Sequence, residues 1–202
     1  MTSQPIRDPA KDHLVTPQNS MLIVIDYQPV QVTSVASMDR RALVTNIVSV
    51  ASLAKLFELP VVLSTVNART GKNAPTIHQL QAILPNAEAL DRTTLNAWED
   101  EQFLRAVRAT GRKKLIMTAL WTEACLAFPT LDALREGYEV YPVVDAVGGT
   151  SLEAHRAALE RIVQAGAKPM SWVQLACELQ RDWARGETAE PFGEIVFAVE
   201  GH

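Results

Sequence analysis

The sequence has few of the features that mark proteins of nucleic acids or membranes. Its formal net charge is −4, and its Lys and Arg residues form no basic stripe, so a nucleic-acid or anionic-membrane surface is not expected. The longest apolar runs, such as Met21–Ile25, are far shorter than the roughly 20 residues that span a bilayer. The N-terminal residues lack the basic and then apolar order of a secretory signal. We therefore expect a cytoplasmic protein with neither kind of partner.

Residues that bind metals and cofactors are also scarce. The two cysteines, Cys125 and Cys177, belong to no Cys-x-x-Cys motif, and the four histidines stand far apart. In a reducing compartment both thiols are expected to be free, and no metal site is predicted. Gly148 and Gly149 follow a predicted strand, but the G-x-G-x-x-G spacing of a dinucleotide fold is absent. We expect no cofactor.

What the sequence does contain is a series of short apolar runs that alternate with amphipathic segments. Its 202 residues, 48% of them hydrophobic, suffice for one sizeable core. The predicted strands are Met21–Ile25, Val61–Ser64, Ala87–Asp91, Leu115–Ala119, Tyr138–Asp145 and Lys168–Met170. Helical periodicity predicts helices at 39–58, 75–83, 99–110, 122–136, 151–164 and 171–185. This alternation predicts a three-layer α/β/α sandwich, with helices on both faces of a Rossmann-like, mainly parallel sheet of about six strands.

Proline and apolar patterning suggest three regions in the chain. Residues 1–18, with three prolines, are predicted to be an extended N-terminal arm. Residues 19–185 carry the alternating pattern and are predicted to form the only domain. The C-terminal tail, 186–202, contains a strand-like run, Ile195–Val199, that is detached from this pattern. We assign the tail to contacts between subunits.

Ligands of such parallel sheets bind beyond the carboxyl ends of the strands, where the winding reverses. That rule places Asp26, Arg92 and the corner 120–125 at one edge of the sheet, with Ser64 and Asp145 nearby. Cys125 is predicted to lie in the first turn of a helix capped by Thr122, where the helix dipole lowers a thiol pKa. Such a thiol is a candidate nucleophile.

The three residue types at this edge have complementary chemistry. Asp26 would take the proton of Cys125, and Arg92 would hold the carboxylate and favour the thiolate. Backbone N–H groups at the corner would stabilise the oxyanion of a tetrahedral intermediate. Together these groups would form one acyl-transfer site.

Each residue also has a plainer structural interpretation. Cys125 alone is more often a small buried hydrophobe, Asp26 a cap, and Arg92 a bridge between surface carboxylates. Cys177, in the middle of a predicted helix, is interpreted as a core residue. His155 and His78 are interpreted as solvated helix positions.

Several spaced motifs resemble the isochorismatase-like cysteine hydrolases, and within them the YcaC-related branch. They are Met21–Gln28, Asp91-Arg92 with Asn96–Trp98, Ala119–Cys125, Gln164–Ala167 and Ala176–Trp183. The resemblance covers roughly residues 10 to 185 and implies a catalytic triad of Asp26, Arg92 and Cys125.

The resemblance also implies details of the corner before Cys125. It places a cis peptide bond at Leu120–Trp121 and an oxyanion hole at the N–H groups of Ala124 and Cys125. The substrate pocket would be lined by Gln28, Asn96, Trp98 and Trp121, although a core or subunit-contact role is an equal alternative for both tryptophans.

Two departures from the family pattern narrow the expected chemistry. The usual basic residue is Lys, whereas this chain has Arg92, which can orient and stabilise charge but cannot shuttle a proton. Nicotinamidase relatives bind a metal through Asp and His near the second strand, but the loop 66–75 contains no His. A metal-dependent nicotinamidase is therefore disfavoured.

The sequence thus predicts a metal-free hydrolase that attacks a small amide or related carbonyl substrate through Cys125 and a covalent acyl-enzyme. The resemblance also implies a ring-based homo-oligomer, for which an octamer is one candidate. A non-catalytic or redox-responsive assembly protein with the same fold is the alternative.

Overall fold

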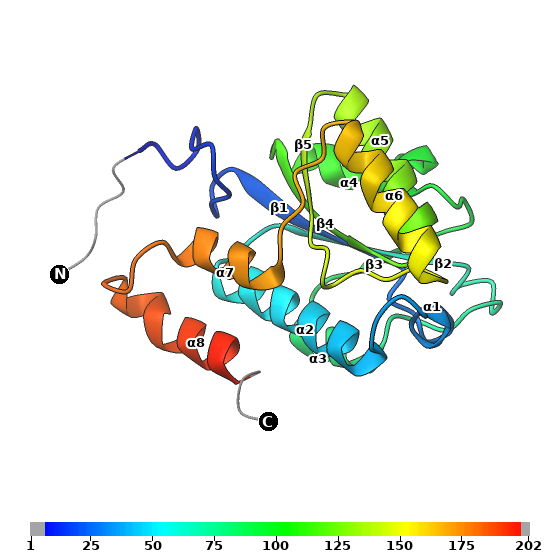
Figure 1. The fold of residues 1–202 in the computed structure, drawn as a ribbon, viewed down its shortest axis with the longest axis horizontal. Helices are drawn as coiled ribbons and strands as arrows, with labels where there is room; N and C mark the ends of the chain where they lie inside the picture. The colour runs from blue at the N-terminus through cyan, green and yellow to red at the C-terminus, as the bar shows by residue number, and fades with distance from the viewer. Residues whose placement is uncertain (1–6, 199–202) are drawn as a thin grey trace.

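One parallel sheet organises the structure, a computed structural model that describes residues 7–198. Its strands lie in the order β3-β2-β1-β4-β5, so the winding reverses between β1 and β4 (Figure 1). The strands are β1 (Ser20–Ile25), β2 (Val61–Val66), β3 (Ala89–Arg92), β4 (Lys114–Ala119) and β5 (Glu139–Pro142). Both central strands, β1 and β4, are buried along their whole length. This is the burial that nearly continuous apolar runs predict for the middle of a parallel sheet.

Helices cover both faces of the sheet, as predicted (Figure 1). The α-helices are α1 (Pro29–Ser34), α2 (Arg40–Leu56), α3 (His78–Ile83), α4 (Glu101–Ala109), α5 (Ala127–Arg135), α6 (Leu152–Gln164), α7 (Trp172–Gln180) and α8 (Gly186–Phe197). The side chains of α2, α3, α7 and α8 form one apolar cluster, and those of α4, α5 and α6 form the other. A 3₁₀ turn, Ala97–Glu99, precedes α4, and a π-helix, Thr122–Leu126, precedes α5. The architecture is a three-layer α/β/α sandwich.

The sheet has five strands where about six were predicted. The segment 168–170 makes only an isolated bridge, between Val143 and Met170. Pro169 lacks an N–H to donate, which limits regular pairing at this edge. The strand predicted at 138–145 is correspondingly short and ends at Pro142.

The strand-like run in the C-terminal tail belongs to a helix, so this prediction was wrong. Residues 186–197 form α8, in which Phe192 is buried and Ile195 and Val196 pack against the core cluster. This spacing of three and four residues forms one helical face, and that face lies against α2 and α7. Packing therefore outweighs the strand propensity of the β-branched residues. Residues 199–202 lie outside the described part of the chain.

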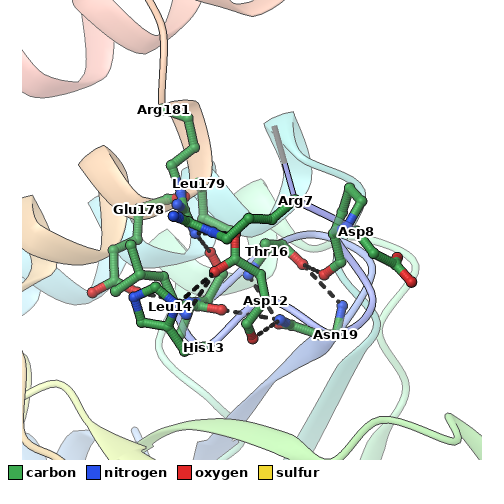
Figure 2. A network of polar contacts seen from close by, with 12 residues as sticks. Arg7, Asp8, Asp12, His13, Leu14, Thr16, Asn19, Glu178, Leu179 and Arg181 are labelled. Atoms are coloured by element: carbon green, nitrogen blue, oxygen red, sulfur yellow. Dashed lines mark hydrogen bonds and ion pairs between the residues drawn. The ribbon is translucent and has the colours of Figure 1, made fainter. Parts of the chain in front are cut away.

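The described part of the N-terminal arm packs on the domain through buried polar groups (Figure 2). The carboxylate of Asp12 lies 3.2 Å from Arg7 Nε and 3.4 Å from Arg181 Nη2. The backbone N–H of Val15 donates to Glu178 Oε2 at 2.7 Å. These contacts tie the arm to α7 and to the residues after it. Within residues 7–198, no helix has the length and apolarity needed to cross a bilayer.

Candidate active site

Asp26 and Arg92 form a buried ion pair at the carboxyl edge of the sheet. Asp26 directly follows β1, and Arg92 is the last residue of β3. The two guanidinium nitrogens Nη1 and Nη2 donate to the two carboxylate oxygens of Asp26, each at 2.7 Å. Neither side chain is more than 1% exposed. This two-point geometry fixes the carboxylate in one orientation.

Further hydrogen bonds hold Arg92 in place. Its Nη1 donates to Ser64 Oγ and to the Thr65 carbonyl oxygen, both at 3.1 Å, and its Nη2 donates to the Leu95 carbonyl oxygen at 3.2 Å. Burial alone disfavours a charged guanidinium, but the hydrogen bonds and charge of Asp26 outweigh it and raise the pKa of Arg92. Arg92 is therefore a permanent cation at the base of the site.

Cys125 reaches the same place from β4. Leu120 pairs with the end of β1, donating its N–H to the Ile25 carbonyl oxygen at 3.1 Å, and the Leu120–Trp121 peptide bond is cis. The π-helix that follows carries Cys125, which is 6% exposed. The Asp26 carboxylate and the backbone N–H of Trp121 are the polar neighbours that act on the pKa of its thiol. The structure thus brings together Asp26, Arg92 and Cys125, the three residues predicted to act as a triad.

The protonation of Cys125 differs from the expectation for a helix N-terminus. Burial, followed by the negative charge and hydrogen bond of Asp26, raises the pKa of the thiol to about 12. Arg92 and the Trp121 N–H act in the opposite direction but do not compensate. The predicted lowering of the thiol pKa was wrong because desolvation disfavours the thiolate more than the nearby cation favours it. In the resting site Cys125 is a neutral thiol.

The turn that carries Cys125 is held by neighbouring loops rather than by a Thr122 cap. The π-helix begins at Thr122, and its N-cap residue is Trp121, which makes no side-chain capping hydrogen bond. Thr122 Oγ1 lies 2.8 Å from His155 Nδ1 on α6, and the Thr122 N–H donates to the Gly148 carbonyl oxygen. Glu123 Oε1 accepts from the backbone N–H and the hydroxyl of Thr150, at 3.0 and 2.6 Å. His155 was expected to be solvated, but it is partly buried against Thr122.

One of the two N–H groups predicted to form an oxyanion hole already has an acceptor within the protein. Ala124 donates its N–H to the Trp121 carbonyl oxygen at 3.2 Å, so this donor is engaged within the turn. The roles of Ala124 and Cys125 as oxyanion donors therefore stay a prediction.

Two polar residues predicted to line a pocket instead support the surrounding loops. Gln28 is buried, and its amide bonds the N–H and carbonyl oxygen of Val66 and the carbonyl oxygen of Ala74. Asn96 caps the 3₁₀ turn and donates to Asp132 Oδ2 at 2.7 Å. Both side chains use their hydrogen-bonding groups within the protein.

The two tryptophans differ in their surroundings. Trp98 is 5% exposed, packs edge-on against Phe103 and Tyr138, and donates from Nε1 to Glu136. It is therefore a core residue, the alternative that the sequence left open. Trp121 is only partly buried and donates from Nε1 to Ser34 Oγ at 2.8 Å. Trp121 lies directly before the turn that carries Cys125, and its role in lining a substrate pocket stays a prediction.

The second cysteine was misplaced by the sequence analysis. Cys177 is exposed on α7, although its neighbours Leu175, Ala176 and Leu179 are buried. Sequence reasoning also missed the contact of His155 with Thr122. The position of His155 in the sequence could have indicated this contact. It lies one helical turn after the capping residue Ser151, and the loop before that helix is at the same edge of the sheet as the site.

A metal ligand set is not found in the part of the chain that the structure describes. Across residues 7–198 no group of three or more His, Cys, Asp or Glu side chains is arranged to hold a metal ion. At the site, the groups that could bind a metal are the Asp26 carboxylate and the Cys125 thiol. Both oxygens of that carboxylate already accept hydrogen bonds from the Arg92 guanidinium.

The sequence matches one family model and several known proteins. The model of the isochorismatase domain matches residues 20–174. The probable hydrolase YcaC of Escherichia coli (strain K12) is 38% identical over 166 residues, which cover 82% of this chain and 79% of that protein. The secreted isochorismatase effector Isc1 of Phytophthora sojae (strain P6497) is 29% identical over 154 residues, or 75% and 72% of the two chains.

Solved structures of two YcaC proteins superpose on most of the chain. YcaC from Pseudomonas aeruginosa, with hexane-2,5-diol and covalent acrylamide, is 31% identical with a TM-score of 0.82 and covers 93% of this chain and 98% of its own. Escherichia coli YcaC, an octameric hydrolase of unknown specificity, is 32% identical with a TM-score of 0.81 and covers 98% of both chains. The chain therefore belongs to the isochorismatase domain family of hydrolases.

Proposed function

We propose that the protein is a metal-free cysteine hydrolase of a small amide or related carbonyl compound, acting through a covalent acyl-enzyme. One observation carries this proposal: the buried Cys125 thiol has as its neighbour the Asp26 carboxylate, which Arg92 holds through two hydrogen bonds, at the point where the winding of the sheet reverses. A nucleophile, a base and an orienting cation in contact are the components that acyl transfer requires.

The first step begins from a neutral thiol. As the Cys125 sulfur attacks the substrate carbonyl carbon, its proton passes to the Asp26 carboxylate, so no free thiolate accumulates. This coupling is needed because the pKa of Cys125 is about 12. The tetrahedral intermediate then collapses, Asp26 gives the proton to the leaving amine, and a thioester remains on Cys125.

The second step reverses these roles with water. Asp26, again a carboxylate, takes a proton from a water molecule that attacks the thioester carbonyl. Collapse of the second tetrahedral intermediate releases the carboxylic acid and returns the proton to the sulfur. Arg92 transfers no proton; its two donors keep the Asp26 oxygens aligned throughout both steps.

Intact-protein mass spectrometry tests this mechanism. The Pseudomonas aeruginosa relative carries covalent acrylamide, which makes acrylamide a suitable first probe, followed by pooled small amides. We expect an adduct on Cys125 in a Cys177→Ser background, and none after Cys125→Ser. Absence of both adducts and hydrolysis products across the pool would leave the non-catalytic alternative.

We also propose that the chain forms a homo-oligomer. The octameric state of Escherichia coli YcaC supports this assembly. At the C-terminal end, Trp183 is 63% exposed and stacks on Phe197, which is 54% exposed, so an apolar surface is available for a second copy. Light scattering should give a mass well above the 22.2 kDa of one chain; a stable monomer would contradict the proposal.

A further inference from the structure

We propose that His155 is a positioning residue for the Cys125 nucleophile, acting through the hydroxyl of Thr122. Its consequence for turnover rests on the hydrolase function proposed above. His155 lies on α6, whereas Thr122 begins the π-helix that carries Cys125. The hydrogen bond between them therefore joins a rigid helix on the face of the sheet to the turn that bears the thiol.

The contact has the geometry of a well-formed hydrogen bond. Thr122 Oγ1 and His155 Nδ1 are 2.8 Å apart, and Thr122 is fully buried. In the tautomer that carries its proton on Nε2, the imidazole accepts the hydroxyl proton at Nδ1. A buried hydroxyl left without a partner is costly, so the bond to His155 favours this position of the π-helix.

The protonation state of the His155 imidazole allows its Nδ1 to accept a hydrogen bond. Burial lowers the pKa of His155 below its usual value; the nearby Glu123 carboxylate works against this shift, and Arg156 adds to it. The ring is therefore neutral near pH 7. A neutral ring leaves Nδ1 free to accept from Thr122.

The surroundings allow little movement of either partner. A Cβ atom added at Gly149 would lie 2.6 Å from Glu123 Oε2 and 3.1 Å from His155 Cβ. The loop at Gly149 therefore packs directly against both the helix and the turn. The Thr122 backbone is fixed on its other side by the Gly148 carbonyl oxygen at 3.0 Å. His155 supplies the side-chain anchor that completes this clamp.

The contacts that hold Thr122 also affect the position of the reacting Cys125 sulfur. Thr122 follows Trp121, whose backbone N–H favours the thiolate of Cys125 by lowering its pKa, and it lies three residues before Cys125 itself. Movement of Thr122 would therefore shift both the sulfur and this N–H. Because small displacements of reacting groups reduce rates strongly, we expect an effect on acylation with little change in substrate binding.

The test compares four variants in the Cys177→Ser background, which leaves Cys125 as the only thiol. His155→Leu removes the acceptor, Thr122→Val removes the hydroxyl, and a third variant combines the two changes. His155→Asn keeps a short polar side chain, and its amide can supply an acceptor or a donor near the position of Nδ1. The readout is the rate constant for modification of Cys125 by acrylamide, followed by intact mass.

We expect His155→Leu and Thr122→Val each to slow the modification about 10-fold, a factor that corresponds to loss of one hydrogen bond. The double variant should be no slower than the single ones, and His155→Asn should recover most of the rate. With an amide that is turned over, kcat should fall while KM stays nearly constant. Melting temperatures that are similar for His155→Asn and His155→Leu would separate positioning from a loss of stability.

Three outcomes would overturn the proposal: an unchanged rate in His155→Leu, additive effects in the double variant, or no recovery in His155→Asn. Failure of the hydrolase proposal is distinguishable, because alkylation of Cys125 requires no turnover. An adduct rate that depends on His155 without hydrolysis of any amide would keep the positioning role and reject the proposed reaction.

Discussion

Replacement of Arg92 by Met is the most direct test of the buried ion pair. Met has a similar length and an apolar stem, so the change removes the charge and the donors while filling much of the volume. It leaves Asp26 wholly buried without its two 2.7 Å partners. Removing one member of a buried pair in this way typically costs about 3–5 kcal/mol of stability, because an uncompensated charge remains.

Two companion variants separate charge from packing. Arg92→Lys keeps the charge but not the two-point geometry, so we expect it to lose roughly 1–2 kcal/mol and to retain part of the Cys125 reactivity. Asp26→Asn combined with Arg92→Met removes both charges and should be more stable than Arg92→Met alone. The double variant should nevertheless be inactive, because no base remains for the thiol proton.

Urea unfolding at pH 7 measures these differences, at one fixed protein concentration because assembly contributes to the stability of an oligomer. The Cys125 adduct rate provides the parallel functional readout. If Arg92→Met loses less than about 1 kcal/mol, the pair behaves like a solvent-exposed one and its assigned role as a fixed scaffold for the base is refuted.

Further predictions concern the thiol, the loop and the core. Burial and Asp26 raise the pKa of Cys125 from 9.0 to about 12. The neutral thiol therefore contributes stability that is complete below pH 9 and is lost as the pH rises toward 12. In that range the difference in unfolding free energy between the wild-type protein and Cys125→Ala should fall by up to about 1.4 kcal/mol per pH unit. Gly149→Ala should slow the modification of Cys125, since its Cβ would approach Glu123 Oε2 to 2.6 Å. The rate of alkylation by acrylamide measures this, and an unchanged rate would argue against the close packing. Trp98→Phe should lower the unfolding free energy by about 1 kcal/mol through loss of the bond to Glu136 while leaving KM unchanged, whereas a raised KM would return Trp98 to the substrate pocket.

The layers of the fold follow from local patterns, and the errors arise where packing decides. The runs 21–25 and 115–119 are apolar on consecutive positions, which identifies central strands of a parallel sheet. The run 195–199 has the same character, yet its residues 195–197 lie on α8, whose side chains Phe192, Ile195 and Val196 pack against the core beside α2. The intrinsic strand preference of a short apolar segment is weak, so the surface against which it packs decides its secondary structure.

The candidate site was predictable to the extent that strand ends converge. Asp26 directly follows one strand of the parallel sheet and Arg92 ends another, so their meeting follows from topology. Side-chain roles one step away did not follow, because they depend on three-dimensional neighbours. Cys177 lies among apolar residues in sequence but on the exposed side of α7, and His155 meets Thr122 only because α6 packs against the π-helix.

The environment of Cys125 reverses the pKa shift that its position in the sequence predicts. A helix N-terminus and a nearby guanidinium predict an activated thiolate, but both act on a side chain that is 6% exposed beside a carboxylate. Desolvation and the charge of Asp26 together outweigh them, and Arg92 is already neutralised by that same carboxylate. A site of this kind gains reactivity only when the proton leaves the sulfur during attack. The carboxylate that raises the thiol pKa is therefore also the group that makes the reaction feasible, because it can take the proton as the sulfur attacks.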